Sequence, residues 1–210
     1  MKFLILTGCW AIIMTSSVMV NSCAAVQFYR PYNAEAAQQL TVLANRGDAD
    51  AQNRLGEMYA TGQNVKQNSV QAVAWFRKSA GQGNANGQYN LGVMYKTGQG
   101  VSQDCAQAVN WIRKAAAQRH ALALNNLGWL YAHGQGVPSQ PVVAYALYTI
   151  AADMDAESGV YAIGNRTALM ETMSVNEIDM ARHLADEMQG SEFLLRLVDI
   201  YIANHVRTPP

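Results

Sequence analysis

The sequence predicts an all-α protein, a right-handed α-solenoid of antiparallel helix pairs with a period of 36 residues. The segment at 91–101 recurs with few changes at 55–65 and again at 127–137, and each copy begins with Leu-Gly and ends with Val. Alanines and large apolar residues follow every copy at matching distances. Self-similarity at a fixed spacing of this size is typical of repeat proteins, in which each helix pair buries its apolar face against its neighbours.

The repeat divides the chain into segments. We expect a signal peptide over 1–22, a tether over 23–33, an N-terminal capping helix over 34–49, three repeats over 50–157 (50–85, 86–121 and 122–157), and a degenerate fourth repeat with C-terminal capping helices over 158–206. Repeat arrays need such terminal caps because the end repeats would otherwise expose their apolar core.

Each full repeat is expected to contain two helices joined by a glycine-rich turn. The glycines at 56, 92 and 128 fall inside the first helix, where glycine costs roughly 1 kcal/mol relative to alanine. Their repetition at one register predicts a close approach of the partner helix, which a side chain would prevent. Asn68 and Asp104 are predicted N-caps of the second helices. Trp75 and Trp111, with the residues that follow them, are expected to face inward.

The pattern weakens in the fourth repeat. Ile163 and Gly164 are expected to keep the Leu-Gly register, after which the motif is lost. Ser174 and Glu177 form the sequence signature of a capping box that begins a new helix. A last amphipathic helix is predicted over 192–206. We interpret these two final helices as a terminal cap, because their polar faces lack the basic bias of a membrane-binding helix.

The overall charge excludes a nucleic-acid footprint but hides an asymmetry. The formal net charge is zero, yet residues 30–120 carry ten Lys/Arg and five Asp/Glu, whereas residues 121–210 carry four and ten. Opposite charges at the two ends would favour weak head-to-tail self-association or steer a charged partner. The alternative is two solvated surfaces that differ in composition.

The N-terminal segment resembles an export signal, because Met1-Lys2 is followed by an apolar run over 3–20 and then by small residues. The segment 20–23 is similar to a bacterial lipobox and predicts lipid attachment at Cys23. Cleavage after Ala24 and a retained membrane anchor are the alternatives. If Cys23 carries lipid, Cys105 has no internal disulfide partner, and we interpret Cys105 as a small helix residue.

The recurring Leu-Gly-x-Met-Tyr, Gly-x-Gly-Val, Ala-x-x-Trp and Lys-Ala-Ala elements over 55–80 and 91–116 resemble the Sel1-like repeats, relatives of the tetratricopeptide repeat. The third copy keeps the first half of the pattern. The resemblance implies a protein–protein interaction adaptor or regulator of the bacterial cell envelope, in the periplasm or anchored to the outer membrane as a lipoprotein. The alternatives are an envelope hydrolase, a cell-wall-binding factor or a secreted host-interaction protein.

In arrays of this type the concave face is lined by outward positions of the first helices. The resemblance therefore implies a partner-binding surface at Asn53, Glu57, Tyr89, Val93, Lys96, Asn125, Trp129 and His133. Amides, aromatic rings and a few charges suit an extended peptide of a protein partner. Trp129 has two interpretations, since it either meets the partner or packs beneath the C-terminal helices.

The sequence contains no pattern that predicts catalysis. The four histidines form no His-Glu-x-x-His pair, there is no Gly-x-Ser-x-Gly elbow, and the Gly98–Gly100 turn does not follow a strand. His183 and Glu187 are four residues apart on one helix, which is more typical of a solvated pair. We therefore expect no enzymatic activity, no cofactor and no metal ion.

Overall fold

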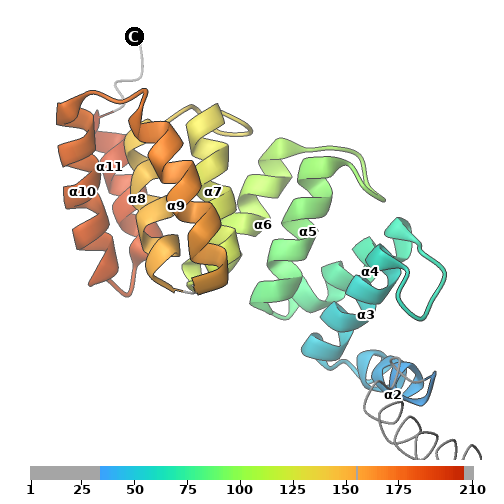
Figure 1. The fold of residues 1–210 in the computed structure, drawn as a ribbon. Helices are drawn as coiled ribbons and strands as arrows, with labels where there is room; N and C mark the ends of the chain where they lie inside the picture. The colour runs from blue at the N-terminus through green and yellow to red at the C-terminus, as the bar shows by residue number, and fades with distance from the viewer. Residues whose placement is uncertain (1–33, 155, 206–210) are drawn as a thin grey trace, which may run out of the picture. The chain divides into compact units, whose positions relative to one another are not determined.

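The computed structural model describes residues 34–154 and 156–205, which form ten α-helices and no strand (Figure 1). The helices are α2 (Ala34–Asn45), α3 (Ala49–Thr61), α4 (Ser69–Gly81), α5 (Ala85–Thr97), α6 (Cys105–Ala117), α7 (Ala121–His133), α8 (Pro141–Met154), α9 (Ala156–Met170), α10 (Val175–Gln189) and α11 (Leu194–His205). The chain has two compact units, residues 1–39 and 40–210, and helices α3 to α11 belong to the second. The expected signal peptide, tether and Cys23 lie outside the described residues.

Helices α3 to α8 pack as three consecutive pairs, α3 with α4, α5 with α6, and α7 with α8, and each pair also contacts the next. The predicted all-α solenoid of antiparallel helix pairs is thus confirmed. Asn68 and Asp104 cap α4 and α6, because their side chains accept hydrogen bonds from the backbone N–H of Gln71 and Gln107. Among the described helices, none is long and apolar enough to cross a membrane.

The repeated glycine of the first helices marks the closest approach within each pair. A Cβ atom at Gly92 would lie 2.5 Å from Cγ1 of Ile112 and 3.2 Å from the carbonyl oxygen of Ala108. Gly56 and Gly128 face the rings of Phe76 and Tyr148 in the same way. The close packing that the sequence predicted for this register is confirmed, and it explains why a residue with poor helix propensity occurs three times.

Phe76 and Ile112, the residues that follow Trp75 and Trp111, fill the space beside Gly56 and Gly92. Phe76 and Ile112 are buried, whereas Trp75 and Trp111 are only half-buried. Trp111 still packs against the cluster around Phe76 and Leu91, but Trp75 does not, so the inward placement was wrong for Trp75. Lys78 and Lys114 instead place their ammonium groups 3.8 and 4.1 Å from the centroids of these rings. Each Trp–Lys pair is a cation–π contact on the outer side of a second helix.

Buried glutamines of the first helices bond both to the preceding helix and to the end of their own repeat. Gln52 donates to the carbonyl oxygen of Ala44, and its own side-chain oxygen accepts a hydrogen bond of 2.8 Å from Gln82. The same arrangement recurs one repeat later, where Gln118 donates to Gln88 at 2.8 Å. These contacts satisfy polar groups that would otherwise be costly to bury.

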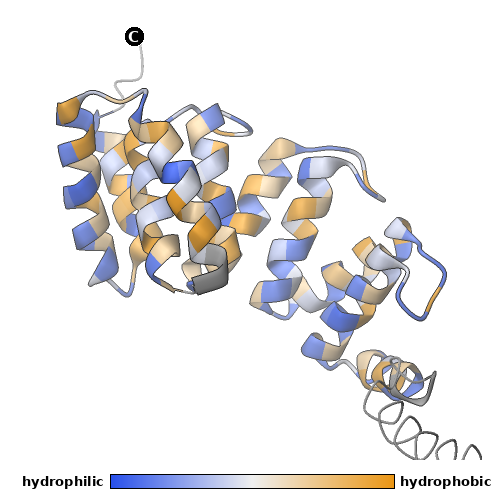
Figure 2. Cartoon of the chain, viewed as in Figure 1, coloured by the Kyte–Doolittle hydropathy of each residue, from blue (hydrophilic) through white to orange (hydrophobic). Residues whose placement is uncertain are grey.

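Helix α8 is the centre of the largest apolar cluster. It packs against α7, α9 and α10, and its residues from Val142 to Tyr148 are all buried. Helix α10, at the left of Figure 2, instead shows many hydrophilic residues on its visible side. A helix that is apolar on every side must be covered on every side, and α8 fits that description.

The register changes by one residue in the fourth repeat, so the expectation for Ile163 and Gly164 was wrong. Ile163 is 47% exposed, and nothing lies within 4 Å of the position of a Cβ at Gly164. Ala162 is buried instead and takes the place of Leu127. Arg166 of α9 donates to Thr149 of α8, at the place where Tyr131 accepts from Arg113 one repeat earlier.

The last two helices lie on second helices of earlier repeats. The capping box of α10 is confirmed, with Ser174 and Glu177 bonded in both directions. Helix α10 packs chiefly against α8, and α11 contacts α6. Arg119 donates to the carbonyl oxygens of Gln189 and Ser191 at the end of α10. The final helix begins at Leu194, two residues later than predicted.

Candidate functional site

The predicted partner-binding residues lie on the first helices α3, α5 and α7, and hydrogen bonds connect these helices to one another and to α9. We use the name first-helix surface for the following set: Asn53, Glu57, Tyr89, Asn90, Val93, Lys96, Asn125, Asn126, Trp129, His133 and Asn165. Hydrogen bonds and ring contacts link seven of the eight predicted members, all but Val93, to a neighbour in this set, and three additional asparagines take part in these contacts.

At the α3 end of the row, three polar side chains form a small network. Asn53 is buried and donates to Glu57 at 2.8 Å, and its side-chain oxygen accepts from Asn90 of α5 at 2.9 Å. Asn90 also donates to Glu57 at 3.2 Å. Glu57 is therefore held in place by two amide donors while its carboxylate stays exposed. Such a fixed acceptor suits the N–H groups or cationic side chains of a partner.

Between α5 and α7 the row contains an aromatic ring, an amide and a cation. Asn126 donates to the hydroxyl oxygen of Tyr89 at 3.2 Å and accepts from the ammonium group of Lys96 at 2.9 Å. Burial raises the pKa of Tyr89 and lowers the pKa of Lys96. Lys96 also lies 4.9 Å from the centroid of the Trp129 ring. Val93 is half-buried beside this group on α5.

Trp129 is half-buried, and it packs against the core while lining a solvent-accessible pocket. The ring stacks on His133, with centroids 4.3 Å apart. The pocket has a volume of about 400 Å³ and lies between α7, α8 and α9. Its walls are Trp129, Ala132, His133, Tyr148, Asn165, Ala168, Leu169 and Thr172. The residues that line this pocket with Trp129 come from α7, α8, α9 and the turn after α9, and none comes from α10 or α11.

At the α9 end, Asn165 donates to the side-chain oxygen of Asn125 at 2.9 Å and also lines the pocket. Asn90, Asn126 and Asn165 were not identified from the sequence. Their hydrogen bonds join residues 37, 37 and 40 positions apart in the sequence. A comparison of equivalent positions, which are 36 residues apart, therefore does not reveal them. Asparagine is frequent on the first helices, and this was the feature of the sequence that could have indicated these residues.

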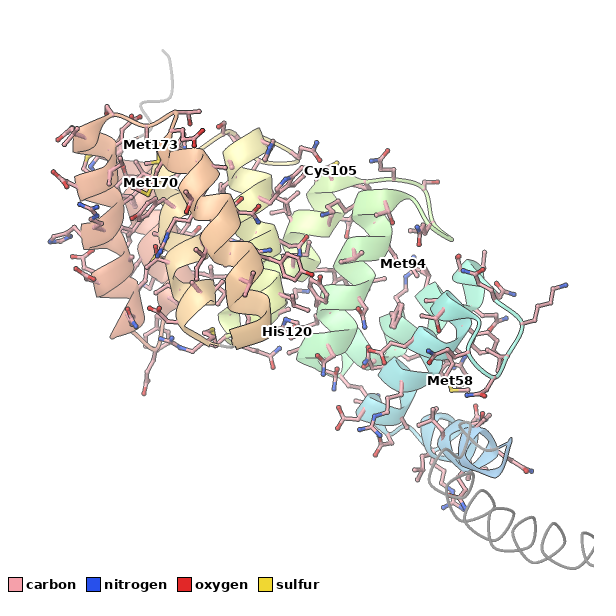
Figure 3. The ribbon with its side chains drawn as sticks, viewed as in Figure 1. Met58, Met94, Cys105, His120, Met170 and Met173 are labelled. Carbon is pink, nitrogen blue, oxygen red and sulfur yellow. The ribbon has the colours of Figure 1, made fainter. Side chains whose placement is uncertain are left out.

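His120 is a fourth residue whose role was not predicted from the sequence. Its Nδ1 accepts from the backbone N–H of Ala123 and caps α7, while its Nε2 lies 2.9 Å from Oδ1 of Asn86 (Figure 3). These contacts need neutral imidazole with the proton on Nε2. Burial lowers the pKa of His120, which favours the same form. Asp48 and Asn84 cap α3 and α5 at the equivalent positions, so the signal was present in the repeat.

Within residues 34–154 and 156–205 no group of three or more His, Cys, Asp or Glu side chains could hold a metal ion. Cys105, at the start of α6, is a free thiol (Figure 3). The chemistry of the first-helix surface is that of hydrogen bonding and aromatic contact.

The fold defines an α-helical repeat protein built from consecutive helix pairs. The family model described as Sel1 repeat matches residues 49–84, 85–120 and 121–155, which together make up more than half of the chain. The protein belongs to the Sel1 repeat family. Repeats of this family typically mediate protein–protein interaction.

Two solved structures share the fold. A protective antigen of uropathogenic Escherichia coli with an SLR fold has a TM-score of 0.56 and 24% identity, over 83% of this chain and 44% of that chain. This chain thus spans less than half the length of that antigen. A Sel1 repeat protein from Oxalobacter formigenes has a TM-score of 0.52 and 31% identity, over 60% of this chain and 96% of that chain. No curated protein matches.

Proposed function

We propose that this protein is an exported adaptor or regulator in the bacterial cell envelope, and that it binds an extended segment of a protein partner on the first-helix surface. The observation that carries the proposal is the continuous row of amides and aromatic rings from α3 to α9, which ends at the pocket beside Trp129. The family supports the binding role, and the N-terminal sequence supports export.

The row offers a partner three kinds of contact. Glu57 supplies a fixed carboxylate at one end, and Tyr89 and Val93 supply apolar surface in the middle. The pocket at the other end combines the Trp129 edge with the Asn165 amide. An extended peptide needs such alternating polar and apolar contacts, because its backbone must stay hydrogen-bonded while its side chains lose contact with water.

Site-specific photo-crosslinking in the cell tests the binding surface. A photoreactive amino acid at Val93 should crosslink to a discrete partner, and one at exposed Asp186 of α10 should not. The crosslink should weaken when Trp129→Ala is added. Equal crosslinking from both positions, or from Val93 with no effect of Trp129→Ala, would contradict a binding site on this surface.

Metabolic labelling with a fatty-acid probe tests the location. Labelling of the wild type that disappears in Cys23→Ala, together with recovery in the membrane fraction, is the result expected for a lipid-anchored envelope protein. A processed, unlabelled and freely secreted form would overturn the envelope assignment. It would not affect the crosslinking result, so the two parts of the proposal are tested separately.

A further inference from the structure

The outer sides of the second helices are covered to different extents: that of α8 is covered, that of α6 is covered only near Arg113, with Ala106 and Asn110 exposed, and that of α4 is open. Helix α10 lies on α8, where Val142 and Ala146 are buried, and α11 contacts α6 at Arg113, in the C-terminal half of α6. Helix α4 is the next in this series. Among the described residues it packs chiefly against α3 and α5, and Val70, Ala74 and Arg77 on its outer side are exposed. The positions equivalent to Val142 and Ala146 are Val70 and Ala74.

The contact between α6 and α11 shows what this kind of surface binds. Arg113 donates through Nη1 to the hydroxyl oxygen of Tyr131 at 2.7 Å, at the boundary between α6 and α7. Its Nη2 donates to both carboxylate oxygens of Asp199 at 2.7 and 2.9 Å. Tyr131 thus fixes the guanidinium on one side, and the docked helix supplies the carboxylate on the other.

The same arginine–tyrosine contact exists one repeat earlier, without the carboxylate. Arg77 of α4 donates through Nη2 to the hydroxyl oxygen of Tyr95 at 3.0 Å, and its guanidinium lies 6.0 Å from the centroid of that ring. Arg77 and Tyr95 are each 36 residues before Arg113 and Tyr131. Arg77 is exposed, and within the described part of the chain no carboxylate forms an ion pair with it.

The apolar residues on the same outer side of α4 are also exposed to solvent. Val70 is 65% exposed and lies about two helical turns before Arg77 on the same outer side of α4, and Ala74 between them is exposed as well. The equivalent Val142 is 5% exposed, because α10 covers it. An exposed valine beside an oriented arginine is the complement of an amphipathic helix that carries a carboxylate next to its apolar stripe.

We propose that the outer side of α4, at Val70, Ala74, Arg77 and Tyr95, is a second docking site, separate from the first-helix surface. Its occupant is an amphipathic helix of another protein, with an Asp or Glu that pairs with Arg77 as Asp199 pairs with Arg113. This helix continues the layer that α10 and α11 form over α8 and α6.

A labelled peptide tests this site with a probe of known sequence. Residues 191–205 of this chain, acetylated, amidated and carrying fluorescein, contain the helix that already binds the equivalent surface. We expect a saturable rise of anisotropy with the complete chain. Arg77→Ala and Val70→Glu in the chain, and Asp199→Asn in the peptide, should each weaken binding about tenfold, as expected for loss of an oriented charge pair or its apolar neighbour.

Two controls identify the site. Lys78 is the residue after Arg77, and its ammonium group lies on the Trp75 ring. Lys78→Ala therefore removes one positive charge next to the proposed site and should leave the affinity unchanged. Arg113→Ala distinguishes docking on α4 from replacement of the chain's own α11 on α6. Binding that depends on Arg113 but not on Arg77, equal losses for Lys78→Ala and Arg77→Ala, or no saturable binding would overturn the proposal. Circular dichroism of each variant shows that the fold is retained.

Discussion

Arg113 and Asp199 are 86 residues apart in the sequence and form a bidentate ion pair between α6 and α11. Burial opposes the charge of Arg113, but Tyr131 and Asp199 outweigh this effect and raise its pKa. Arg119 also contacts the C-terminal region, at the end of α10. Two cations of the basic half, Arg113 and Arg119, therefore contact the acidic C-terminal helices. The charge asymmetry of the sequence therefore has a use within one chain.

We expect Asp199→Asn to lower the free energy of unfolding by about 0.5–1 kcal/mol, because the pair is bidentate but Asp199 is 59% exposed. Arg113→Ala should cost more, since the hydroxyl of Tyr131 also loses its donor. Urea unfolding at low and high salt measures both losses, and the loss for Asp199→Asn should shrink in high salt. Asp179→Asn, in an exposed pair with Arg182, serves as the control and should have little effect.

Replacement of the repeated glycines should separate close packing from helix propensity. Gly92→Ala gains propensity but forces Ile112 to move, and we expect a net loss of about 1–3 kcal/mol. Gly164→Ala is the matched control inside α9, where no neighbour lies within 4 Å, and it should be neutral or stabilise by up to about 1 kcal/mol. Thermal or urea unfolding measures both. Equal losses at the two positions would contradict the register change in the fourth repeat.

The His120 cap predicts a pH dependence. Its pKa in the folded protein lies below the usual value of about 6.5, so its contribution to stability is complete above that pH and decreases as the pH falls below it. His120→Asn keeps a cap like Asn84 but does not titrate. Between pH 7.5 and 5.5 the wild type should lose stability relative to this variant by urea unfolding. Parallel stability curves would show that His120 does not respond to protonation.

Loss of a buried glutamine contact should cost more than a surface change. Gln118→Ala removes the donor to Gln88, whose side chain is buried, and we expect a loss of about 1–3 kcal/mol. Gln88→Leu introduces the residue found at the equivalent Leu124, which is fully buried. The double variant should then cost less than the sum of the two single changes. Strict additivity in urea unfolding would indicate that the two side chains do not interact.

The period of 36 residues was sufficient to predict the helix pairs, the close approach at Gly92 and the caps at Asn68 and Asp104. Each of these features depends on residues close in the sequence or recurs at the same position of every 36-residue repeat. The inward placement of Trp75 failed because Trp75 and Phe76 are adjacent, and helical spacing alone does not show which of the two faces the core. The structure assigns the core position to Phe76 and the outer position to Trp75, under Lys78.

The C-terminal region was less predictable because its contacts are not periodic. One residue fewer before Ala162 moves Ile163 to the surface, and no motif in the sequence marks that change. The contact of α11 with α6 also joins segments that share no repeat register. The eight residues proposed for the partner surface came from the repeat register, whereas the asparagines that connect them cross repeats at other spacings.

The apolar core is uneven along the chain. A large cluster joins α6, α7, α8, α10 and α11, while a separate and smaller cluster around Phe76 and Leu91 holds α4 and α5 together. In a linear array each repeat depends on its neighbours, so regions with less buried apolar surface open more often. Amide protons of α3 and α4 should therefore exchange with solvent sooner than those of α8. The α4 docking site lies in the half that opens first, and a helix bound there would slow exchange where the chain is least protected.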